Sequence, residues 1–374
     1  MKRSDLIFIL SSFFVWRIVI FIFAVVAIRF VPLFSHNYFG GGYSNYVINP
    51  LFWGHLNFDG EHYLAIAQDG YRPLEYFFFP LFPYLINALT FVKTQEMYAV
   101  VGLIISNLSF LVALIGIFKL VKLDYKENIA KLTVILFLIF PTSFYFGMYY
   151  TESIFLALIV WSFYFVRRNN FILASIVAAF ASATRLIGAV MLGVIAFELF
   201  LKKRRDFWTI LISPLGVILY VYYLWKQTGD PLIFLHQVSI FGEQRSSTLI
   251  LLPQVLYRYI FKILPFVNYS YFPNVFTTYL EFIIGVGLIV LIIYGLFRLR
   301  LSYSIYAIFA YLIPTLAGSF SSMPRYALAI FPVFILMAIY IDKLPKFYKF
   351  ILFSVMILLM FISTAMFWRG YWLS

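Results

Sequence analysis

Three ionisable side chains crowd into one short stretch of the sequence, where Asp59, Glu61 and His62 stand within four consecutive positions. A carboxylate or an imidazole placed there could accept a proton from a hydroxyl group, which is the chemistry of a general base. The residues from Glu61 to Gln68 have helical character, and Asp59 stands where a helix N-cap is expected. Capping explains one acid at a helix start, but not three ionisable groups beside an apolar, aromatic segment. We therefore predict a functional site at this cluster.

Two arginines at the ends of apolar segments are the expected binders of an anion. Arg185 and Arg325 each stand in a short polar turn at such an end. A buried guanidinium is costly unless it meets an anion, and its planar fork suits phosphate. The alternative is an ion pair, for instance between Arg185 and Glu152, which would position either the arginine or a substrate. The rest of the predicted substrate-binding set lies in the first loop: Glu61, His62, Tyr71 and Arg72.

The composition identifies the elements that must hold these residues. Of 374 residues, 64% are hydrophobic and 11% are charged, whereas a soluble domain carries about 25% charged residues. Apolar runs of about 18 residues or more recur, each long enough to cross a hydrocarbon core of about 30 Å. No polar stretch is long enough for a separate soluble domain. We predict a single all-α, polytopic membrane domain over residues 1–374.

The apolar runs predict about eleven membrane spans. Phe77–Val92 contains two prolines and is expected to be re-entrant or interfacial. Two of the predicted spans, Phe171–Thr184 and Leu186–Leu201, are short enough to form a hairpin of less than full depth. The predicted spans are Leu6–Val31, Met97–Phe118, Leu132–Met148, Ser153–Val166, Phe171–Thr184, Leu186–Leu201, Phe207–Trp225, Val275–Phe297, Tyr303–Gly318, Tyr326–Ile341 and Phe350–Phe367.

Alternate connections between these spans are basic, for example Lys202–Arg205, and the positive-inside rule makes them cytoplasmic. The formal net charge of +13 is therefore read as a topology signal and not as a nucleic-acid footprint. The N-terminus is expected inside and the C-terminus outside. The first loop (about 34–92) and a second long loop (about 227–273) then lie on the outer side, with the predicted site. In a prokaryote this would be the cell membrane.

Several other chemistries are disfavoured. The chain has no cysteine, which excludes disulfides, thiolate metal sites and cysteine nucleophiles. The residues Asp59-Gly60-Glu61 have the spacing of an acid pair that holds a divalent cation. Such cations require several oxygen ligands and few are evident, so we expect no metal and no other cofactor. The isolated histidines His36, His55 and His236 lack the spacing of metal ligands.

Several short motifs, in this order, resemble those of one known family. They are Asp59-Gly60-Glu61-His62-Tyr63, Ile66-Ala67, Gly70-Tyr71, Phe78-Phe79-Pro80-Leu81-Phe82-Pro83, Tyr150-Thr151-Glu152-Ser153, Ala183-Thr184-Arg185-Leu186-Ile187-Gly188 and Met323-Pro324-Arg325-Tyr326. The sequence resembles the PIG-V family, the second mannosyltransferases of GPI-anchor assembly and their prokaryotic relatives. The segments from His36 to Pro50 and from Gln227 to Pro273 match no motif of this family.

The resemblance implies a GT-C glycosyltransferase: a multi-span helical protein that takes a hexose, with mannose the expected sugar, from a polyprenyl or dolichyl phosphate. The acceptor would be a glycan or a lipid-linked molecule, and the reaction would invert the anomeric centre. An acid of the first outer loop is essential in that superfamily, and Asp59 occupies its position, so the resemblance implies Asp59 as the catalytic general base. One carboxylate suffices because polyprenyl phosphate is already a good leaving group, whereas a glycosidase usually needs two carboxyl groups. Arg185 and Arg325 would hold the donor phosphate.

Two other classes of function stay open. A secondary transporter also combines many apolar spans with a few buried charges. Transporters tend, however, to show internal repeats and ionisable residues at mid-membrane depth, whereas the acids here concentrate in an outer loop. A non-catalytic partner subunit of a membrane transferase is the second alternative, and it would keep its activity when Asp59 is replaced by asparagine.

Overall fold

The computed structural model describes residues 1–34, 39–204, 206–237, 246 and 248–373. His36 and Arg205, named above, lie outside this part. The regular structure of the described residues is helical, apart from one isolated β-bridge between Ile250 and Ala317. The chain divides into two compact units. Unit 1 comprises Met1–Tyr71, Leu81–Arg168 and Phe334–Trp372; unit 2 comprises Arg72–Pro80, Asn169–Val333 and Leu373–Ser374.

Unit 1 is built around two pairs of helices, in which α6 packs against α8 and α1 packs against α18. Close approach of α6 to its surroundings depends on glycine, since a Cβ at Gly102 would lie 2.1 Å from the ring of Tyr149. The helices of unit 1 are α1 (Arg3–Phe30), α2 (Tyr43–Ile48), α3 (Pro50–Trp53), η1 (Gly54–Leu56), α4 (Asp59–Asp69), α5 (Leu81–Leu89), α6 (Gln95–Val121), α7 (Glu127–Ile139), η2 (Ser143–Gly147), α8 (Glu152–Arg167), α17 (Phe331–Lys343, whose first residues belong to unit 2) and α18 (Lys346–Trp368).

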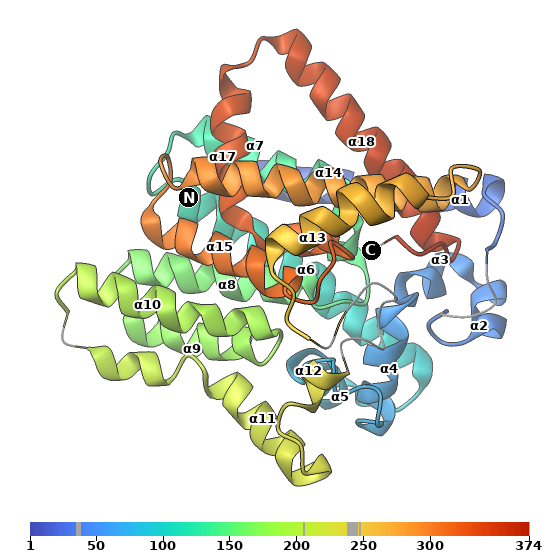
Figure 1. Ribbon diagram of the computed structural model, residues 1–374, viewed down its shortest axis with the longest axis horizontal. Coiled ribbons are helices and arrows are strands. Elements are labelled where there is room, and N and C mark those ends of the chain that lie inside the picture. Colours follow the sequence, from blue (N-terminus) through green and yellow to red (C-terminus); the bar gives the residue numbers. More distant parts are fainter. Residues whose placement is uncertain (35–38, 205, 238–245, 247, 374) are drawn as a thin grey trace. The chain divides into compact units, whose positions relative to one another are not determined.

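Unit 2 contains a helical hairpin, α9 and α10, whose arms lie side by side, and α10 also packs against α15 (Figure 1). The helix α14 packs against α15 and against the short α16. The helices of unit 2 are α9 (Phe171–Ser182), η3 (Leu186–Ala189), α10 (Val190–Leu201), η4 (Phe207–Leu211), α11 (Leu215–Thr228), α12 (Ile233–His236), α13 (Leu252–Arg258), a π-helical turn η6 (Tyr259–Ile263), η7 (Leu264–Phe266), α14 (Phe272–Gly295), α15 (Leu301–Thr315), α16 (Met323–Tyr326) and η8 (Ala327–Ala329).

Five helical segments of the described part are long and apolar enough to cross a membrane: α1, α6, Phe207–Thr228, α14 and α18. A sixth is obtained if the bent pair Met323–Ala329 and Phe331–Lys343 counts as one span. The protein is therefore an integral, multi-pass membrane protein. Other predicted spans are shorter apolar helices, and the total of about eleven stays a prediction.

The segment predicted to be re-entrant folds as α5, a helix of nine residues from Leu81 to Leu89. At 1.5 Å per residue it is about 14 Å long, roughly half of a hydrocarbon core. The two short predicted spans correspond to the apolar helices Phe171–Ser182 and Leu186–Leu201, the second made of η3 and α10. At 1.5 Å per residue they are about 18 Å and 24 Å long, shorter than a hydrocarbon core of about 30 Å. A hairpin of less than full depth stays a prediction.

Candidate functional site

The helix that carries Asp59 begins after a strained residue. The backbone of Phe58 has φ 59° and ψ −119°, a conformation that a bulky L-residue rarely adopts, and Asp59 is the first residue of α4. Such a residue costs on the order of 1–3 kcal/mol and persists where its surroundings determine it. The Phe58 ring packs against the rings of Phe367 and Trp372, each with its centroid 5.5 Å away. The helix thus starts at one fixed position, one residue away from the cap expected from the sequence.

A buried hydrogen-bond network fixes the chain just before this helix. The Asn57 side chain is fully buried, and its amide donates to the carbonyl oxygen of Phe367 at 3.0 Å. The Asn57 carbonyl oxygen accepts a hydrogen bond of 2.7 Å from the phenol of Tyr150. Because buried polar groups are costly when unpaired, these bonds hold the start of α4 against its neighbours.

The starts of α4 and α8 lie together, since three hydrogen bonds cross between the segments that contain them. The Tyr149 N–H donates to the His55 carbonyl oxygen at 3.0 Å, and the Tyr150 phenol reaches Asn57 as described. Farther along, the Tyr63 hydroxyl lies 3.3 Å from the Thr151 hydroxyl. Asp59 and Glu152 are the first residues of these two helices. Both acids therefore stand at the ends of their helices that carry the positive end of the helix dipole.

The side chains around this point differ in access. Glu152 is buried, at 3% exposure, whereas Asp59 and His62 are partly exposed and Glu61 is exposed. Tyr71, beyond the end of α4, is partly exposed, and its ring meets that of Tyr84 edge-on. Unit 1 thus gathers Asp59, Glu61, His62 and Glu152 at neighbouring helix starts, with Asp59 accessible enough to meet a substrate.

Arg72 and its neighbours belong to unit 2, where they form a turn. The Arg72 N–H donates to the Glu75 carboxylate at 2.9 Å, and the Glu75 side chain is buried. The phenol of Tyr220 in α11 donates to the Tyr76 carbonyl oxygen at 2.7 Å. The Arg72 side chain is exposed. This turn is therefore held by α11, and its arginine faces outward.

The two predicted phosphate-binding arginines come together around one aromatic ring. The guanidinium carbon of Arg185 lies 5.8 Å from the centre of the Tyr326 ring, and that of Arg325 lies 5.7 Å from it. Arg185 precedes η3 in extended conformation, while Arg325 lies in α16 and is buried, at 4% exposure. The ring attracts both cations and so offsets part of their mutual repulsion. This arrangement concentrates positive charge in unit 2. The predicted pair of Arg185 with Glu152, which lies in unit 1, stays a prediction.

A half-buried arginine inside an apolar helix was not identified from the sequence. Arg17 lies inside α1, and its Nη2 is 3.5 Å from Nε2 of His55. The other ring nitrogen of His55 lies 3.1 Å from the Phe52 carbonyl oxygen, so His55 donates there through Nδ1 and accepts from Arg17 through Nε2. Burial and the neighbouring Arg17 charge lower the pKa of His55 to about 3. The signal in the sequence was an arginine in the middle of an apolar span.

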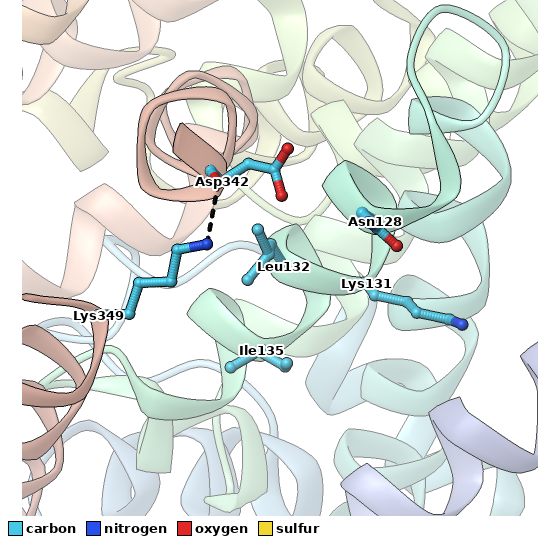
Figure 2. Close-up of a pocket in the computed structure, with 6 residues that line it drawn as sticks. All are labelled: Asn128, Lys131, Leu132, Ile135, Asp342 and Lys349. Atoms are coloured by element: carbon cyan, nitrogen blue, oxygen red, sulfur yellow. Dashed lines mark hydrogen bonds between the residues drawn. The ribbon is translucent and has the colours of Figure 1, made fainter. Parts of the chain in front are cut away.

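Other features of the described residues lie apart from this site. A hollow of about 250 Å³ in unit 1 is lined by Asn128, Lys131, Leu132, Ile135, Asp342 and Lys349 (Figure 2). None of the predicted site residues lines it, and its lysines belong to the connections predicted to be cytoplasmic. In the part of the chain that the structure describes, no three histidine or acidic side chains group as a metal site would require.

Comparison with known protein families shows to which family the chain belongs. The sequence pattern of the mannosyltransferase (PIG-V) family matches residues 6–213, more than half of the chain. The chain therefore belongs to the mannosyltransferase (PIG-V) family, which is a family of glycosyltransferases. The matched part contains Asp59, Glu152 and Arg185; Arg325 lies beyond it. None of the curated proteins compared with the chain matches it.

Solved structures similar to the chain include the oligosaccharyltransferase of Archaeoglobus fulgidus. In its apo form the identity is 12%, 98% of this chain and 56% of that chain are covered, and the TM-score is 0.44. For its complex with Zn and sulfate the identity is 13%, 94% of this chain and 53% of that chain are covered, and the TM-score is 0.46. For the complex of the Archaeoglobus fulgidus oligosaccharyltransferase AglB with an inhibitory peptide and a dolichol-phosphate, the identity is 12%. There 95% of this chain and 56% of that chain are covered, and the TM-score is 0.43. The chain spans just over half the length of these proteins, and a likeness at this level carries no argument about mechanism.

Proposed function

We propose that the protein is a membrane glycosyltransferase with a GT-C-type fold that moves a hexose, with mannose the expected sugar, from a polyprenyl phosphate to a hydroxyl group of a glycan or glycolipid. Membership of the mannosyltransferase family supports the reaction class. The observation that carries the donor class is the approach of both Arg185 and Arg325 to the Tyr326 ring, because two guanidiniums beside one ring suit a phosphate.

The proposed reaction is a single displacement at the anomeric carbon. The acceptor oxygen forms a bond to that carbon while the bond from the carbon to the phosphate oxygen breaks, and the electron pair leaves with the polyprenyl phosphate. The acceptor proton passes to the Asp59 carboxylate. Attack opposite the leaving group inverts the anomeric centre. Arg185 and Arg325 stabilise the charge that develops on the departing phosphate.

The remaining predicted residues have supporting roles in this proposal. Glu152 stands at a helix start beside that of Asp59, and Glu61 and His62 follow Asp59 on α4. We assign these three side chains, with Tyr71 and Arg72, to the acceptor. The reaction is assigned to the extracytoplasmic face, because the basic connections are predicted to be cytoplasmic.

The test is transfer of radiolabelled mannose from polyprenyl-phosphate mannose to a panel of glycan acceptors by purified protein in lipid. Asp59→Asn is expected to lower transfer by about 100-fold or more, since a general base contributes roughly 10²–10⁴. Donor binding and thermal stability should stay as in the wild type. Asp69→Asn, the same change at an exposed acid at the other end of the same helix, is the matched control and is expected to keep most of the transfer.

Other results would change the assignment. Equal transfer by wild type and Asp59→Asn removes Asp59 as the base. If Asp59→Asn keeps the transfer and only omission of the whole protein abolishes it, a non-catalytic partner subunit is favoured. A wild type that neither binds the donor nor transfers sugar contradicts the proposal and favours a transporter.

A further inference from the structure

An acid lies inside the apolar helix α14 of unit 2. Glu281 is buried, at 5% exposure, in a helix long and apolar enough to cross the membrane. An ionisable group at such a position costs free energy and is retained where it has a function. The proposed reaction assigns no function to Glu281.

The Glu281 carboxylate binds two donors from different parts of unit 2. One oxygen accepts a hydrogen bond of 3.0 Å from the phenol of Tyr259, and the other accepts a hydrogen bond of 3.1 Å from the backbone N–H of Ser322. The Tyr259 oxygen in turn accepts from the Phe320 N–H at 3.2 Å. Burial and the Glu281 charge raise the pKa of Tyr259, which keeps its proton available for the carboxylate. Two backbone N–H groups of the Ser319–Ser322 turn are thus bound by this pair of side chains.

The ring of Phe320 fixes the same turn by packing. It lies 4.9 Å from the Tyr259 ring. On its other side it meets α14 closely, because a Cβ at Gly285 would lie 2.9 Å from the Phe320 ring. Glycine at this position therefore permits the contact between turn and helix.

The turn leads directly into the helix that carries the phosphate-binding arginine. Ser322 has φ 64° and ψ 9°, in the left-handed region, and it is the residue before α16. Its carbonyl oxygen accepts hydrogen bonds from the N–H groups of Arg325 at 3.0 Å and Tyr326 at 2.9 Å. Because α16 has four residues, it makes few hydrogen bonds of its own, and its direction follows the turn before it.

We propose that Glu281 is a positioning residue of the phosphate site: together with Tyr259 it fixes the Ser319–Ser322 turn, and thereby the orientation of Arg325 and Tyr326 toward the donor phosphate. This inference rests on the proposed function. Glu281 does not touch the donor. It acts through Arg325, whose side chain has to be oriented before the phosphate arrives if its binding energy is to be realised.

The first test measures the dissociation constant for polyprenyl-phosphate mannose in lipid. Glu281→Gln keeps one acceptor oxygen but offers an N–H₂ group in place of the other, and Tyr259→Phe removes the phenol from both Glu281 and Phe320. Each change is expected to weaken donor binding about five- to tenfold, with acceptor KM unchanged. Tyr311→Phe is the matched control, because it removes a buried hydrogen bond of 3.0 Å from a phenol to the Gly285 carbonyl oxygen on the same helix and leaves the hydrogen bonds of Glu281, Tyr259 and Phe320 in place. It is expected to leave donor binding unchanged.

The second test is a double-mutant cycle with Arg325→Ala. If Glu281 acts through Arg325, Glu281→Gln adds no further loss of donor affinity once Arg325 is absent. Additive losses, or an unchanged dissociation constant in both Glu281→Gln and Tyr259→Phe, overturn the inference. If Glu281→Gln fails to fold, Tyr259→Phe provides the same cycle. Failure of the proposed function is recognised separately, since the wild type itself would then bind no donor.

Discussion

Arg185 and Arg325 stand 140 positions apart in the sequence, yet their guanidinium carbons lie 5.8 and 5.7 Å from the centre of one ring, that of Tyr326. Each arginine belongs to a different short motif, and the ring belongs to the second. The proposed phosphate site therefore includes a third side chain, one that contacts both cations instead of binding the anion itself.

This relationship predicts that the ring matters and its hydroxyl does not. Tyr326→Leu is expected to weaken binding of polyprenyl-phosphate mannose by about three- to thirtyfold, since a cation over an aromatic face gains about 0.5–2 kcal/mol and two cations are held here. Tyr326→Phe keeps the face and is expected to bind the donor within twofold of the wild type. The measurement is the donor dissociation constant in lipid. Equal losses in both variants would show that the hydroxyl, not the ring face, is responsible.

A second prediction concerns the network that holds the start of α4. Tyr150→Phe removes the hydrogen bond of 2.7 Å to the buried Asn57 carbonyl oxygen. We expect it to lower the free energy of unfolding by about 1–2 kcal/mol, because a buried acceptor loses its partner, and to lower sugar transfer as Asp59 is held less firmly. Thermal unfolding and transfer in the same lipid check both effects.

The neighbouring tyrosine supplies the control for this change. The Tyr149 hydroxyl is buried and has no hydrogen-bond partner among the described residues. Tyr149→Phe is therefore expected to be neutral or slightly stabilising, since it deletes an unsatisfied polar atom without changing the ring. A loss of stability in Tyr149→Phe as large as that in Tyr150→Phe would contradict the assigned network.

A third prediction tests how closely Arg17 approaches η2. A Cβ at Gly147 would lie 2.2 Å from Nη1 of Arg17, so Gly147→Ala requires the guanidinium to move away from His55. We expect a loss of about 1–3 kcal/mol in the free energy of unfolding. Gly193→Ala is the control, because nothing lies within 4 Å of a Cβ there and the site is inside α10. It is expected to gain up to about 1 kcal/mol from helix propensity.

The sequence predicts the local features of the site better than its assembly. The helical character of Glu61–Gln68 and the position of Asp59 at a helix start are local properties, and α4 confirms them with the cap moved by one residue to Phe58. The positive φ of Phe58 could not be predicted, because an aromatic side chain favours extended backbone and only the packing against Phe367 and Trp372 holds it otherwise.

Contacts between residues far apart in the chain cannot be predicted from the sequence pattern, for a physical reason. Nothing in the spacing of Arg185 and Arg325 specifies that both approach the Tyr326 ring, because these contacts are set by the packing of η3 and α16 around α15. Glu281 is different, because an acid inside an apolar span can be recognised in the sequence. It indicates a function even before its partners Tyr259 and Ser322 are known.

The fourth prediction is a pH dependence that arises from His55. In the unfolded chain His55 binds a proton below its usual pKa of about 6.5, whereas in the folded protein burial and the Arg17 charge lower that pKa to about 3. Between these two values the unfolded state binds more protons than the folded state, so the free energy of unfolding falls as the pH is lowered from about 7 toward 4. Each unit by which the pKa of His55 differs between the folded and unfolded states changes the free energy of unfolding by about 1.4 kcal/mol at most. The thermal midpoint of the wild type in lipid should drop across this range, and that of His55→Gln, which has no proton to bind, should drop less. Identical pH profiles for the two proteins would show that other groups set the acid stability and that His55 is not held neutral by Arg17.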